Sequence, residues 1–475
     1  MANGQMKPIL VLGGGPAGCA AASLLKRWGH DVVVRTKKAS SGPRLIESIP
    51  PSTRKLFDTI GLRAAIDSAA FLRSTGNTVS WGAADARVER FGEGELGWQV
   101  TRAGFAAQLL AHLSTAGVRV EDARVDPTPV GGIRPAFTLD CTGRAGVVAR
   151  ARRLRLHEGS RTVALTGIWQ AVERFDVPDP THTLIESYEG GWAWSVPESA
   201  RTRVVAVMVN PTTSGLVRGA GAREIYLHEL QKTSHVAALM DRALLVDGPA
   251  GWDASMYHAR RYVDGDALLV GDAASFIDPV SSVGIKKALA SGWLAAVAVH
   301  TSVQRPDMRE IALEFFAARE AEVYTSLKAI TDRVFADAAS GHAHPFWGDR
   351  SEADAPLQSG TSQIAARDAV SAAFERLRGA DVLSVGPGPD VRIEPRPAVS
   401  GIEIVLEPRL TRKDEPQGIR YAYDVDLIGL FELAPMYTSV PDAFAAYNRR
   451  NAPVSLPDFL GALSTALAQK WLVWV

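Results

Sequence analysis

The stretch 8-PILVLGGGPAG-18 decides the fold. The apolar run Pro8–Leu12 predicts a short buried strand, which a glycine turn, an alanine-rich helix and a second strand at Asp31–Val34 follow. In such a unit Gly13 makes the turn, Gly15 lets the backbone approach a pyrophosphate, and Gly18 allows close packing of helix on strand. Because a helix N-terminus presents free N–H groups and a positive dipole end, the stretch predicts dinucleotide binding.

The end of the second strand departs from the usual dinucleotide-binding pattern. An Asp or Glu normally holds the ribose hydroxyls there, whereas this chain has Thr36, flanked by Arg35, Lys37 and Lys38. A threonine hydroxyl lacks the bidentate geometry of a carboxylate, so we predict weaker and more exchangeable cofactor binding. The basic residues indicate either a 2′-phosphate site or a solvated turn.

A second stretch, 271-GDAASFIDPVSSVGIKKAL-289, follows the apolar strand 267–270 and leads into a long helix. Asp272 comes directly after the strand, where a carboxylate can bind hydroxyls of an extended ligand. The helix is expected to begin at Val283–Gly284, which directs N–H groups and the positive helix end toward an electron-rich group. Alone, this pattern is also compatible with an ordinary βα turn.

Length and composition exclude several classes of protein. The 475 residues are 46% hydrophobic, which is enough for two or three domains, and the net charge of zero favours neither nucleic acid nor membrane as a partner. Cys19 and Cys141 are too few for a disulfide framework or a zinc site, and no metal site is predicted. Without a signal peptide or an apolar window of about 18 residues, we expect a cytoplasmic protein; the oligomeric state is not predicted.

The order of patterns predicts a discontinuous α/β organisation. Residues 1–150 and 254–338 are expected to form the nucleotide-binding domain. Longer alternating strands within 151–253 predict an antiparallel substrate-binding sheet inserted into it. Residues 339–475 are expected to form linkers at 340–362 and 385–397 and a small α+β module.

Four pieces occur together in a recognisable order: Gly13–Gly18, Arg102, Asp140–Arg144 and Gly271–Gly284. Together they resemble the superfamily of class A flavoprotein monooxygenases and flavin-dependent halogenases, which bind FAD. The resemblance covers roughly residues 6–335. It implies a Rossmann-like FAD-binding domain with an inserted, p-hydroxybenzoate hydroxylase-like substrate sheet.

The resemblance also implies roles for single residues. The glycine turn would hold the FAD pyrophosphate, Asp272 the ribityl–pyrophosphate region, and Pro279 and Gly284 would approach the flavin ring. Glu47 lies on the flavin side and is the candidate acid/base, with a helix-capping or salt-bridged glutamate as the alternative. Electrons would come from NAD(P)H or a separate flavin reductase, and O2 would be the co-substrate. The full cofactor-binding set is Gly13, Gly15, Gly18, Thr36, Arg44, Arg102, Asp272, Pro279 and Gly284, beside Asp140 and Gly143 after the strand 136–139.

The choice between halogenation and oxygenation depends on two further patterns. The segment 191-GWAWSVP-197 is similar to the halogenase signature Trp-x-Trp-x-[Ile/Val]-Pro. Flavin halogenases, however, use a relay lysine, expected near residues 70–85, and this chain has no lysine between Lys55 and Lys232. The loop Ser281–Gly284 also shifts the usual Ser/Thr pair by one position. We therefore predict oxygenation through a C4a-hydroperoxyflavin, with halogenation by an unusual relay, or a non-catalytic flavin-binding chaperone, as alternatives.

Asp278–Leu289 looks most like a narrower branch that builds tryptophylquinone cofactors, including the monooxygenase of quinohaemoprotein amine dehydrogenase biogenesis. This implies hydroxylation of a tryptophan within a polypeptide, so a protein or peptide substrate is the predicted partner. Trp192, Trp194 and His258 are the candidate pocket residues; plain core packing and a structural histidine are the alternatives. Residues 421–472 resemble winged-helix peptide-recognition modules, which a substrate could join by strand addition, or they form a helical cap or dimer contact.

Overall fold

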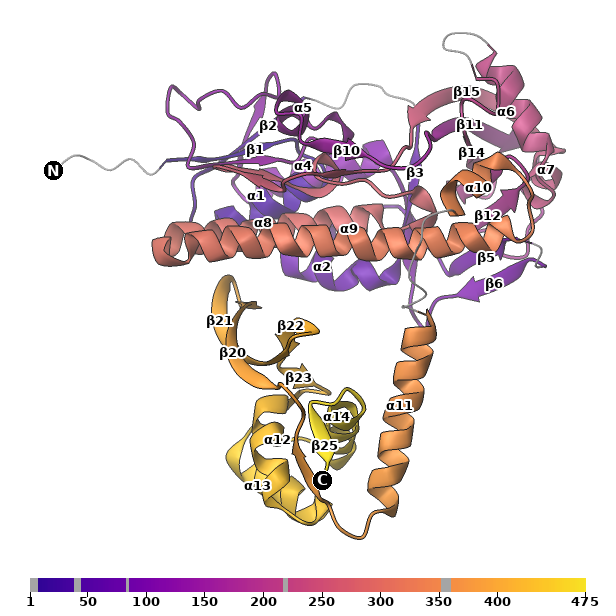
Figure 1. The fold of residues 1–475 in the computed structure, drawn as a ribbon. Coiled ribbons are helices and arrows are strands. Elements are labelled where there is room, and N and C mark those ends of the chain that lie inside the picture. The colour runs from indigo at the N-terminus through magenta and orange to yellow at the C-terminus, as the bar shows by residue number, and fades with distance from the viewer. Residues whose placement is uncertain (1–6, 38–43, 83–84, 217–220, 352–359) are drawn as a thin grey trace. The chain divides into compact units, whose positions relative to one another are not determined.

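The protein is described by a computed structural model covering residues 7–37, 44–82, 85–216, 221–351 and 360–475. It divides into two compact units, Met1–Ala353 and Asp354–Val475, drawn in Figure 1 and described separately below. Both the Rossmann-like nucleotide fold and the inserted antiparallel sheet that the sequence predicts are present in the first unit.

The centre of the first unit is a mostly parallel sheet. Among the described residues its strand order is β17-β18-β9-β1-β2-β8, and all but β17 run parallel. The central strand β1 is buried throughout, as expected for a strand covered on both faces. The carboxyl ends of the parallel strands meet at one edge, where ligands bind in such folds. The strands are β1 (Ile9–Leu12), β2 (Val32–Thr36), β8 (Arg119–Asp122), β9 (Phe137–Asp140), β17 (Val263–Asp264) and β18 (Ala267–Leu269).

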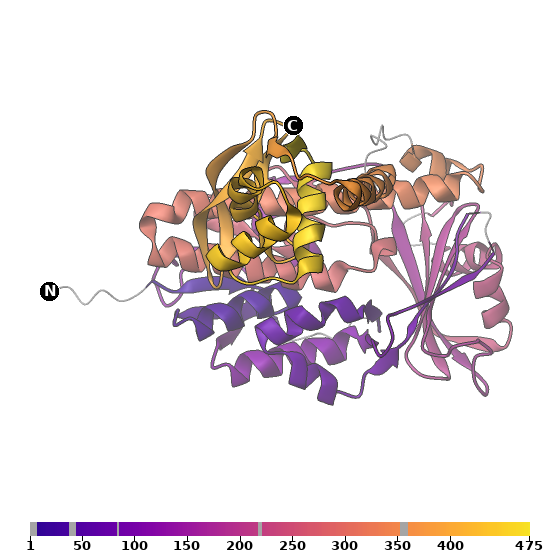
Figure 2. The ribbon, with the colours of Figure 1, turned by 90° about the horizontal axis from the view of Figure 1, so that it is seen from below.

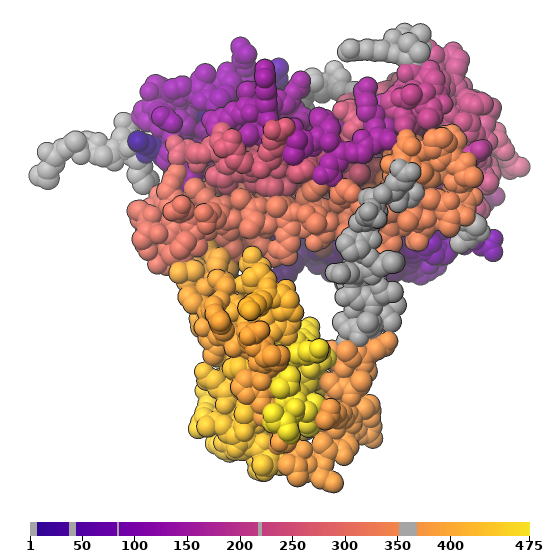
Figure 3. Space-filling model, in the orientation of Figure 1, coloured from indigo at the N-terminus to yellow at the C-terminus, as the bar shows by residue number. Residues whose placement is uncertain are grey.

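Long helices pack on this sheet and on one another. The helix α1 (Pro16–Arg27) contacts α4 (Arg102–Thr115) and α8 (Gly284–Gln304), and α9 (Arg309–Ala339) packs against α8 (Figure 1). Small residues allow the close approach of α1 and α8: a Cβ at Gly292 would lie 2.2 Å from the Ala17 carbonyl oxygen. The outer side of α9 lies at the surface of the unit, as Figure 3 shows in salmon and orange.

The second sheet of this unit has the strand order β15-β11-β14-β13-β12-β5-β6 within the described ranges. Neighbours are antiparallel except β5 and β12, which are parallel. Two of its strands precede residue 151, so the sheet reaches beyond the predicted insertion 151–253, whose boundaries stay a prediction. The strands are β5 (Gly76–Ser80), β6 (Arg87–Arg90), β11 (Val163–Ala171), β12 (Thr183–Tyr188), β13 (Gly191–Pro197), β14 (Thr202–Val209) and β15 (Ala243–Asp253).

The two faces of the seven-stranded sheet carry different cores. One face packs against α6 (Ala222–Gln231) and α7 (His235–Met240) through an apolar core that includes Tyr226 and Val236 (Figure 2). The other face carries what we call the aromatic cluster. Its rings are Trp81, Trp192, Phe335, Phe346 and Trp347, with Trp194 partly buried against them. Phe346 and Trp347 come from α10 (Pro345–Ser351), within a region the sequence predicted to be a linker.

Smaller elements join the two sheets. The three-stranded antiparallel sheet β3-β7-β4 leads the chain from the nucleotide fold toward the seven-stranded sheet. Its strands and the remaining elements are β3 (Ile46–Ile49), β4 (Leu72–Ser74), β7 (Gly97–Thr101), α2 (Arg54–Ile60), α3 (Arg63–Ser68), α5 (Val147–Ala151), and the pair β10 (Arg155–His157) and β16 (Tyr257–Ala259).

The second unit is an α+β fold with a core of its own, which contains Leu430, Tyr447, Phe459, Leu463 and Trp471. The expected linker at 385–397 is wrong: it forms β19 and part of β20, since prolines are tolerated in an edge strand. The elements are α11 (Gly360–Gly379), β19 (Val385–Pro387), β20 (Arg392–Ser400), β21 (Glu403–Arg412), β22 (Glu415–Ile419), β23 (Tyr421–Ala422), β24 (Val425–Asp426), α12 (Leu427–Leu433), α13 (Val440–Arg450), α14 (Leu456–Ala468) and β25 (Leu472–Trp474).

In neither unit does a helix of the described residues have the length and apolar character needed to span a membrane.

Candidate functional site

The glycine turn after β1 has the geometry of a pyrophosphate site. Gly13 adopts φ +98°, and a Cβ there would lie 2.5 Å from the Cys141 carbonyl oxygen. A Cβ at Gly18 would lie 1.9 Å from the Gly13 carbonyl oxygen, so α1 can approach β1 only without a side chain at that position. At Gly15, the N-cap of α1, a Cβ would meet no atom within 4 Å. The open space at this helix N-terminus leaves room for a phosphate.

Thr36, at the end of β2, lies beside this turn. Its methyl carbon is 3.3 Å from the position of a Cβ at Gly14, and its hydroxyl makes a long contact of 3.4 Å with the Lys37 carbonyl. Arg35 is buried and points elsewhere, donating to Glu121 at 2.9 Å and to the Thr128 carbonyl at 2.6 Å. Arg35 is therefore a structural anchor and does not form a 2′-phosphate site, whereas Lys38 lies outside the described residues.

Glu47, Arg102 and Asp272 come together at the same edge of the sheet. Arg102, the first residue of α4, donates from Nε to Glu47 Oε1 at 2.8 Å. The Glu47 carboxylate raises the pKa of Arg102 against the opposing effect of burial, and the charge of Asp272 adds to the rise. The structure thus pairs the candidate acid/base with a cofactor-side arginine, which is the salt-bridge alternative for Glu47.

A buried lysine, Lys287, contacts the Asp272 carboxylate. It is not among the site residues predicted from the sequence. Lys287 on α8 places its Nζ 3.3 Å from Asp272 Oδ1 and donates to the Ser275 carbonyl at 2.5 Å. The Gly271 N–H donates to the Ser291 hydroxyl at 2.8 Å. Arg155 donates to the Asp272 and Ala273 carbonyls, each at 3.3 Å. Side chains from α8 and from β10 therefore fix the turn after β18.

Pro279 and Gly284 flank the start of α8. Pro279 opens a short 3₁₀ turn capped by Asp278, whose carboxylate accepts from the Val280 N–H at 3.1 Å. Gly284 is exposed, has open space around it, and begins a helix without a side-chain cap. Because uncapped N–H groups and the helix dipole favour electron-rich ligands, this end of α8 suits a flavin ring.

Asp140 and Arg44 have other partners. The Asp140 carboxylate is buried and accepts from the N–H groups of Val148 at 2.7 Å and Ala149 at 3.1 Å, so it caps α5. Arg44 pairs with Glu198, in the turn between β13 and β14. The structure therefore brings neither side chain onto the glycine turn.

The tryptophans of β13 lie next to the flavin-side loop. Trp192 is fully buried in the aromatic cluster, with its ring centre 6.3 Å from that of Trp81. Trp194 is partly buried and also contacts a second small core that contains Ile46 of β3. Val280, beside Pro279, packs against the aromatic cluster. Trp192 thus acts as core, and Trp194 is the tryptophan of this pair that keeps exposed surface.

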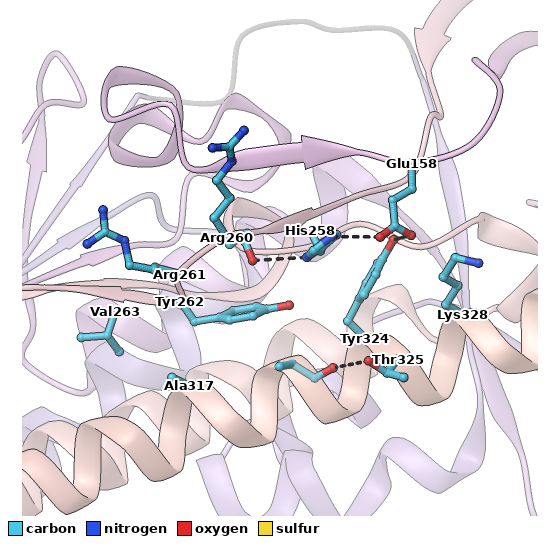
Figure 4. A pocket seen from close by; sticks show the side chains of 12 residues that line it. Glu158, His258, Arg260, Arg261, Tyr262, Val263, Ala317, Tyr324, Thr325 and Lys328 are labelled. Atoms are coloured by element: carbon cyan, nitrogen blue, oxygen red, sulfur yellow. Dashed lines mark hydrogen bonds and ion pairs between the residues drawn. The ribbon is translucent and has the colours of Figure 1, made fainter.

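His258 lies in a different place, a cavity of 690 Å³ between β16 and α9 (Figure 4). Its Nε2 is 2.9 Å from Glu158 Oε1, and its ring stacks on Tyr324 at 5.0 Å. Tyr324 donates to the same carboxylate at 3.0 Å. His258 is therefore not brought together with Trp192 and Trp194, which corrects the single pocket expected for all three.

The geometry fits an extended dinucleotide with a flavin ring. A phosphate can enter at Gly15, a hydroxylated chain at Asp272, and a planar electron-rich ring at the open N-terminus of α8. Throughout the described ranges no group of three or more His, Cys, Asp and Glu side chains could hold a metal ion.

Comparison with known proteins places this site in a family. The tryptophan halogenase family model matches residues 95–379, more than half of the chain, and the chain therefore belongs to the tryptophan halogenase family. A flavin-dependent halogenase of Armillaria mellea (armH5) is 27% identical over 338 residues. This match covers 62% of the chain and 65% of that relative, so the chain spans less than two thirds of the relative's length.

Two solved structures are similar over nearly the whole chain. The flavin-dependent halogenase CmlS superposes with a TM-score of 0.78 at 20% identity, covering 99% of this chain and 98% of that one. QhpG, a peptidyl tryptophan dihydroxylase essential for tryptophylquinone cofactor biogenesis, superposes with a TM-score of 0.70 at 22% identity, covering 98% and 99%. At these identities the similarity establishes the fold.

Proposed function

We propose that this chain is an FAD-dependent enzyme that uses O2 to modify an aromatic ring, and that the modification is hydroxylation. Its family and the geometry around Gly15, Asp272 and Gly284 support the cofactor. When bound, reduced FAD supplies the activation of O2. Its electrons come from NAD(P)H at the flavin face or from a separate reductase.

The observation that carries hydroxylation is the absence of a relay lysine. The expected segment, 70–85, contains β5 and Trp81. Val79 and Trp81 point into the aromatic cluster, and Trp81 donates its indole N–H to the Val334 carbonyl at 2.7 Å. Where a halogenase needs an ammonium group, Val79 and Trp81 present apolar side chains, and the indole N–H of Trp81 is already hydrogen-bonded. We infer that these apolar side chains help to exclude water from the reaction space.

Residues of the protein would bind the cofactor, stabilise charge on the flavin ring and accept a proton. The glycine turn and α1 bind the pyrophosphate, and Asp272 accepts a hydrogen bond from the hydroxylated chain. The N-terminus of α8 stabilises negative charge on the ring. The Glu47 side chain is 29% exposed and accepts a hydrogen bond from Arg102. We infer that Glu47 takes up the proton that leaves the aromatic carbon when hydroxylation restores the ring.

For the substrate we favour an indole, in particular a tryptophan within a polypeptide. The loop Asp278–Leu289 resembles the tryptophylquinone branch, and the fold extends over the full length of QhpG. The second unit would then hold the polypeptide beside the enzyme. A sheet edge such as β20 is suited to pairing with an extended chain.

The mass of the product tests the reaction. The holoenzyme, supplied with reduced FAD, O2, chloride and a tryptophan-containing peptide, is expected to add 16 or 32 mass units, as one or two inserted oxygen atoms require. A Glu47→Gln variant should keep FAD and lose turnover by about 100-fold, typical of a lost general base. A chlorine isotope doublet in the product would overturn hydroxylation.

Halogenation remains a second candidate because two observations favour it. The family model is that of tryptophan halogenases, and β13 contains the Trp-x-Trp-x-Val-Pro pattern at 192–197. This reaction would need a cation other than a lysine of β5. In the same assay, a product that gains chlorine only when chloride is present would support it.

A further inference from the structure

Lys287 is a buried cation that joins two parts of the cofactor-side turn. Its side chain is 3% exposed. Its Nζ contacts the Asp272 carboxylate at 3.3 Å and the Ser275 carbonyl at 2.5 Å. Burial of an ammonium group is costly unless charged and polar partners surround it. These contacts therefore tie the position of the Asp272 side chain to α8.

A buried carboxylate on α9 completes the arrangement. Glu320 is 5% exposed. The positive charge of Lys287 and the Ser291 hydroxyl both favour the ionised form of Glu320 and lower its pKa against the effect of burial. The same hydroxyl accepts the Gly271 N–H at 2.8 Å. Glu320 is thus coupled electrostatically to the turn that Lys287 contacts.

The contact with Lys287 leaves part of the Asp272 carboxylate accessible to a ligand. Lys287 contacts one carboxylate oxygen of Asp272, whose side chain is still 31% exposed. The charge of Asp272 also raises the pKa of Arg102. We propose that Lys287 and Glu320 are positioning residues that present the Asp272 carboxylate to the cofactor and make cofactor affinity depend on pH. This inference rests on FAD binding, and it does not depend on which reaction follows.

The direction of the pH dependence of FAD binding follows from Lys287, whose charge acts on both Asp272 and Glu320. Burial raises the pKa of Glu320 to about 7, against the opposing charge of Lys287. When Glu320 is protonated, the Lys287 ammonium group interacts with Asp272 and Ser275. When Glu320 is ionised, its negative charge also attracts that ammonium group and weakens the contact with Asp272. The other titratable groups that face Glu320 are Cys141 and Tyr262, and burial raises both of their pKa values, so they stay neutral near pH 7. FAD should therefore bind more weakly as the pH rises through about 7.

The test measures FAD binding to the apoprotein by fluorescence quenching at pH 6 and pH 8. Lys287→Met keeps the length of the side chain without its charge and is expected to raise the FAD Kd about tenfold at pH 6, the effect of one lost charged interaction. Lys286→Met is the matched control, because Lys286 bonds instead to the Ser52 hydroxyl at 3.0 Å. Its Kd should change less than about twofold.

Two further variants separate positioning from general stability. Glu320→Gln should bind FAD as the wild type does at pH 6 and lose the change between pH 6 and pH 8. Lys287→Met and Asp272→Asn together should cost no more than the larger single loss, because they act on one contact. Should Lys287→Met fail to fold, the double variant Lys287→Met/Glu320→Gln removes the unpaired charge and takes its place.

An unchanged Kd in Lys287→Met, additive losses with Asp272→Asn, or a pH dependence that persists in Glu320→Gln would each overturn the inference. Wild-type protein that does not bind FAD at all would instead overturn the proposed function. Chlorinated product would leave the positioning role intact.

Discussion

Gly15 and Gly18 lie three residues apart in one turn and have different roles. A Cβ at Gly18 would collide with the Gly13 carbonyl oxygen at 1.9 Å, whereas a Cβ at Gly15 would meet open space. Gly15 adopts φ −74°, which any residue can adopt. The first glycine therefore serves ligand access, and the second serves helix packing.

This difference predicts opposite outcomes for two single substitutions. Gly18→Ala should lower the free energy of unfolding by about 2 kcal/mol, the typical cost of overpacking, as measured by urea denaturation of the apoprotein. Gly15→Ala should leave that free energy within about 0.5 kcal/mol and weaken FAD binding. Equal stability of the two variants would contradict the assignment of Gly18 to packing.

Asp278 gives the folded protein a pH dependence of its own. Burial raises the pKa of Asp278 from 3.8 to about 6, although the Val280 N–H and Arg350 act against the rise. Between about pH 4 and pH 6 the folded state thus keeps a proton that the unfolded state has released. The free energy of unfolding should fall as the pH rises through this window, by about 3 kcal/mol from this group.

Asp278→Asn should remove this contribution, because an amide still accepts the Val280 N–H but does not titrate. Asp307→Asn on the exposed surface is the control, and it should leave the pH dependence of the free energy unchanged. Chemical denaturation at pH 4, 5 and 6 measures both. A slope that survives in Asp278→Asn would contradict the prediction.

At the scale of the element, the short helix α7 is fixed to the seven-stranded sheet by one buried carboxylate. Glu186 on β12 accepts from the N–H groups of Ser234 at 2.6 Å and Val236 at 2.8 Å, and from that of His235 at 3.0 Å. A six-residue helix has little stability of its own. The carboxylate satisfies N–H groups at its start and compensates the helix dipole.

Glu186→Gln should therefore lower the free energy of unfolding by about 2 kcal/mol, since its NH₂ group cannot accept from the helix N–H groups. Glu189→Gln, in the exposed turn that follows β12, is the matched control and should cost less than about 0.5 kcal/mol. Urea denaturation measures both. Equal losses would show that the cap contributes nothing beyond general polarity.

At the scale of the whole molecule, the chain consists of two units with separate cores. Every residue proposed for the cofactor lies in Met1–Ala353, and Asp354–Val475 encloses its own apolar cluster around Leu463 and Trp471. A unit of this size with its own core can fold alone. Under the proposed function, the first unit would carry out the chemistry and the second would bind the polypeptide substrate.

Expressed alone, residues 354–475 should unfold in one cooperative transition, followed by circular dichroism and tryptophan fluorescence. Residues 1–353 should bind FAD within about twofold of the full chain, yet turn over a peptide substrate more slowly than the full chain does. Equal turnover of the peptide by the shortened and full-length proteins would contradict a role for the second unit in peptide binding.

Local patterns predicted much of the cofactor side. The turns at Gly13 and Asp272 and the helix starting at Gly284 depend on residues close in sequence, and they lie where expected. The sequence also predicts strands at 181–188 and 191–197, which form at 183–188 and 191–197. The strand β15 and the strands within 385–400 were missed. Their pairing depends on partners far along the chain, and prolines in an edge strand look like loop residues.

The class of protein follows from local sequence patterns, because a glycine turn or a strand end has the same physical meaning wherever the rest of the chain lies. Which charged residues share a site depends on the folded arrangement. The fold pairs Glu47 with Arg102, places His258 in a separate cavity, and brings Lys287 into contact with Asp272. Such contacts join helices and strands that are distant in the sequence. Burial, which gives these charges their effect, arises only when those elements pack together.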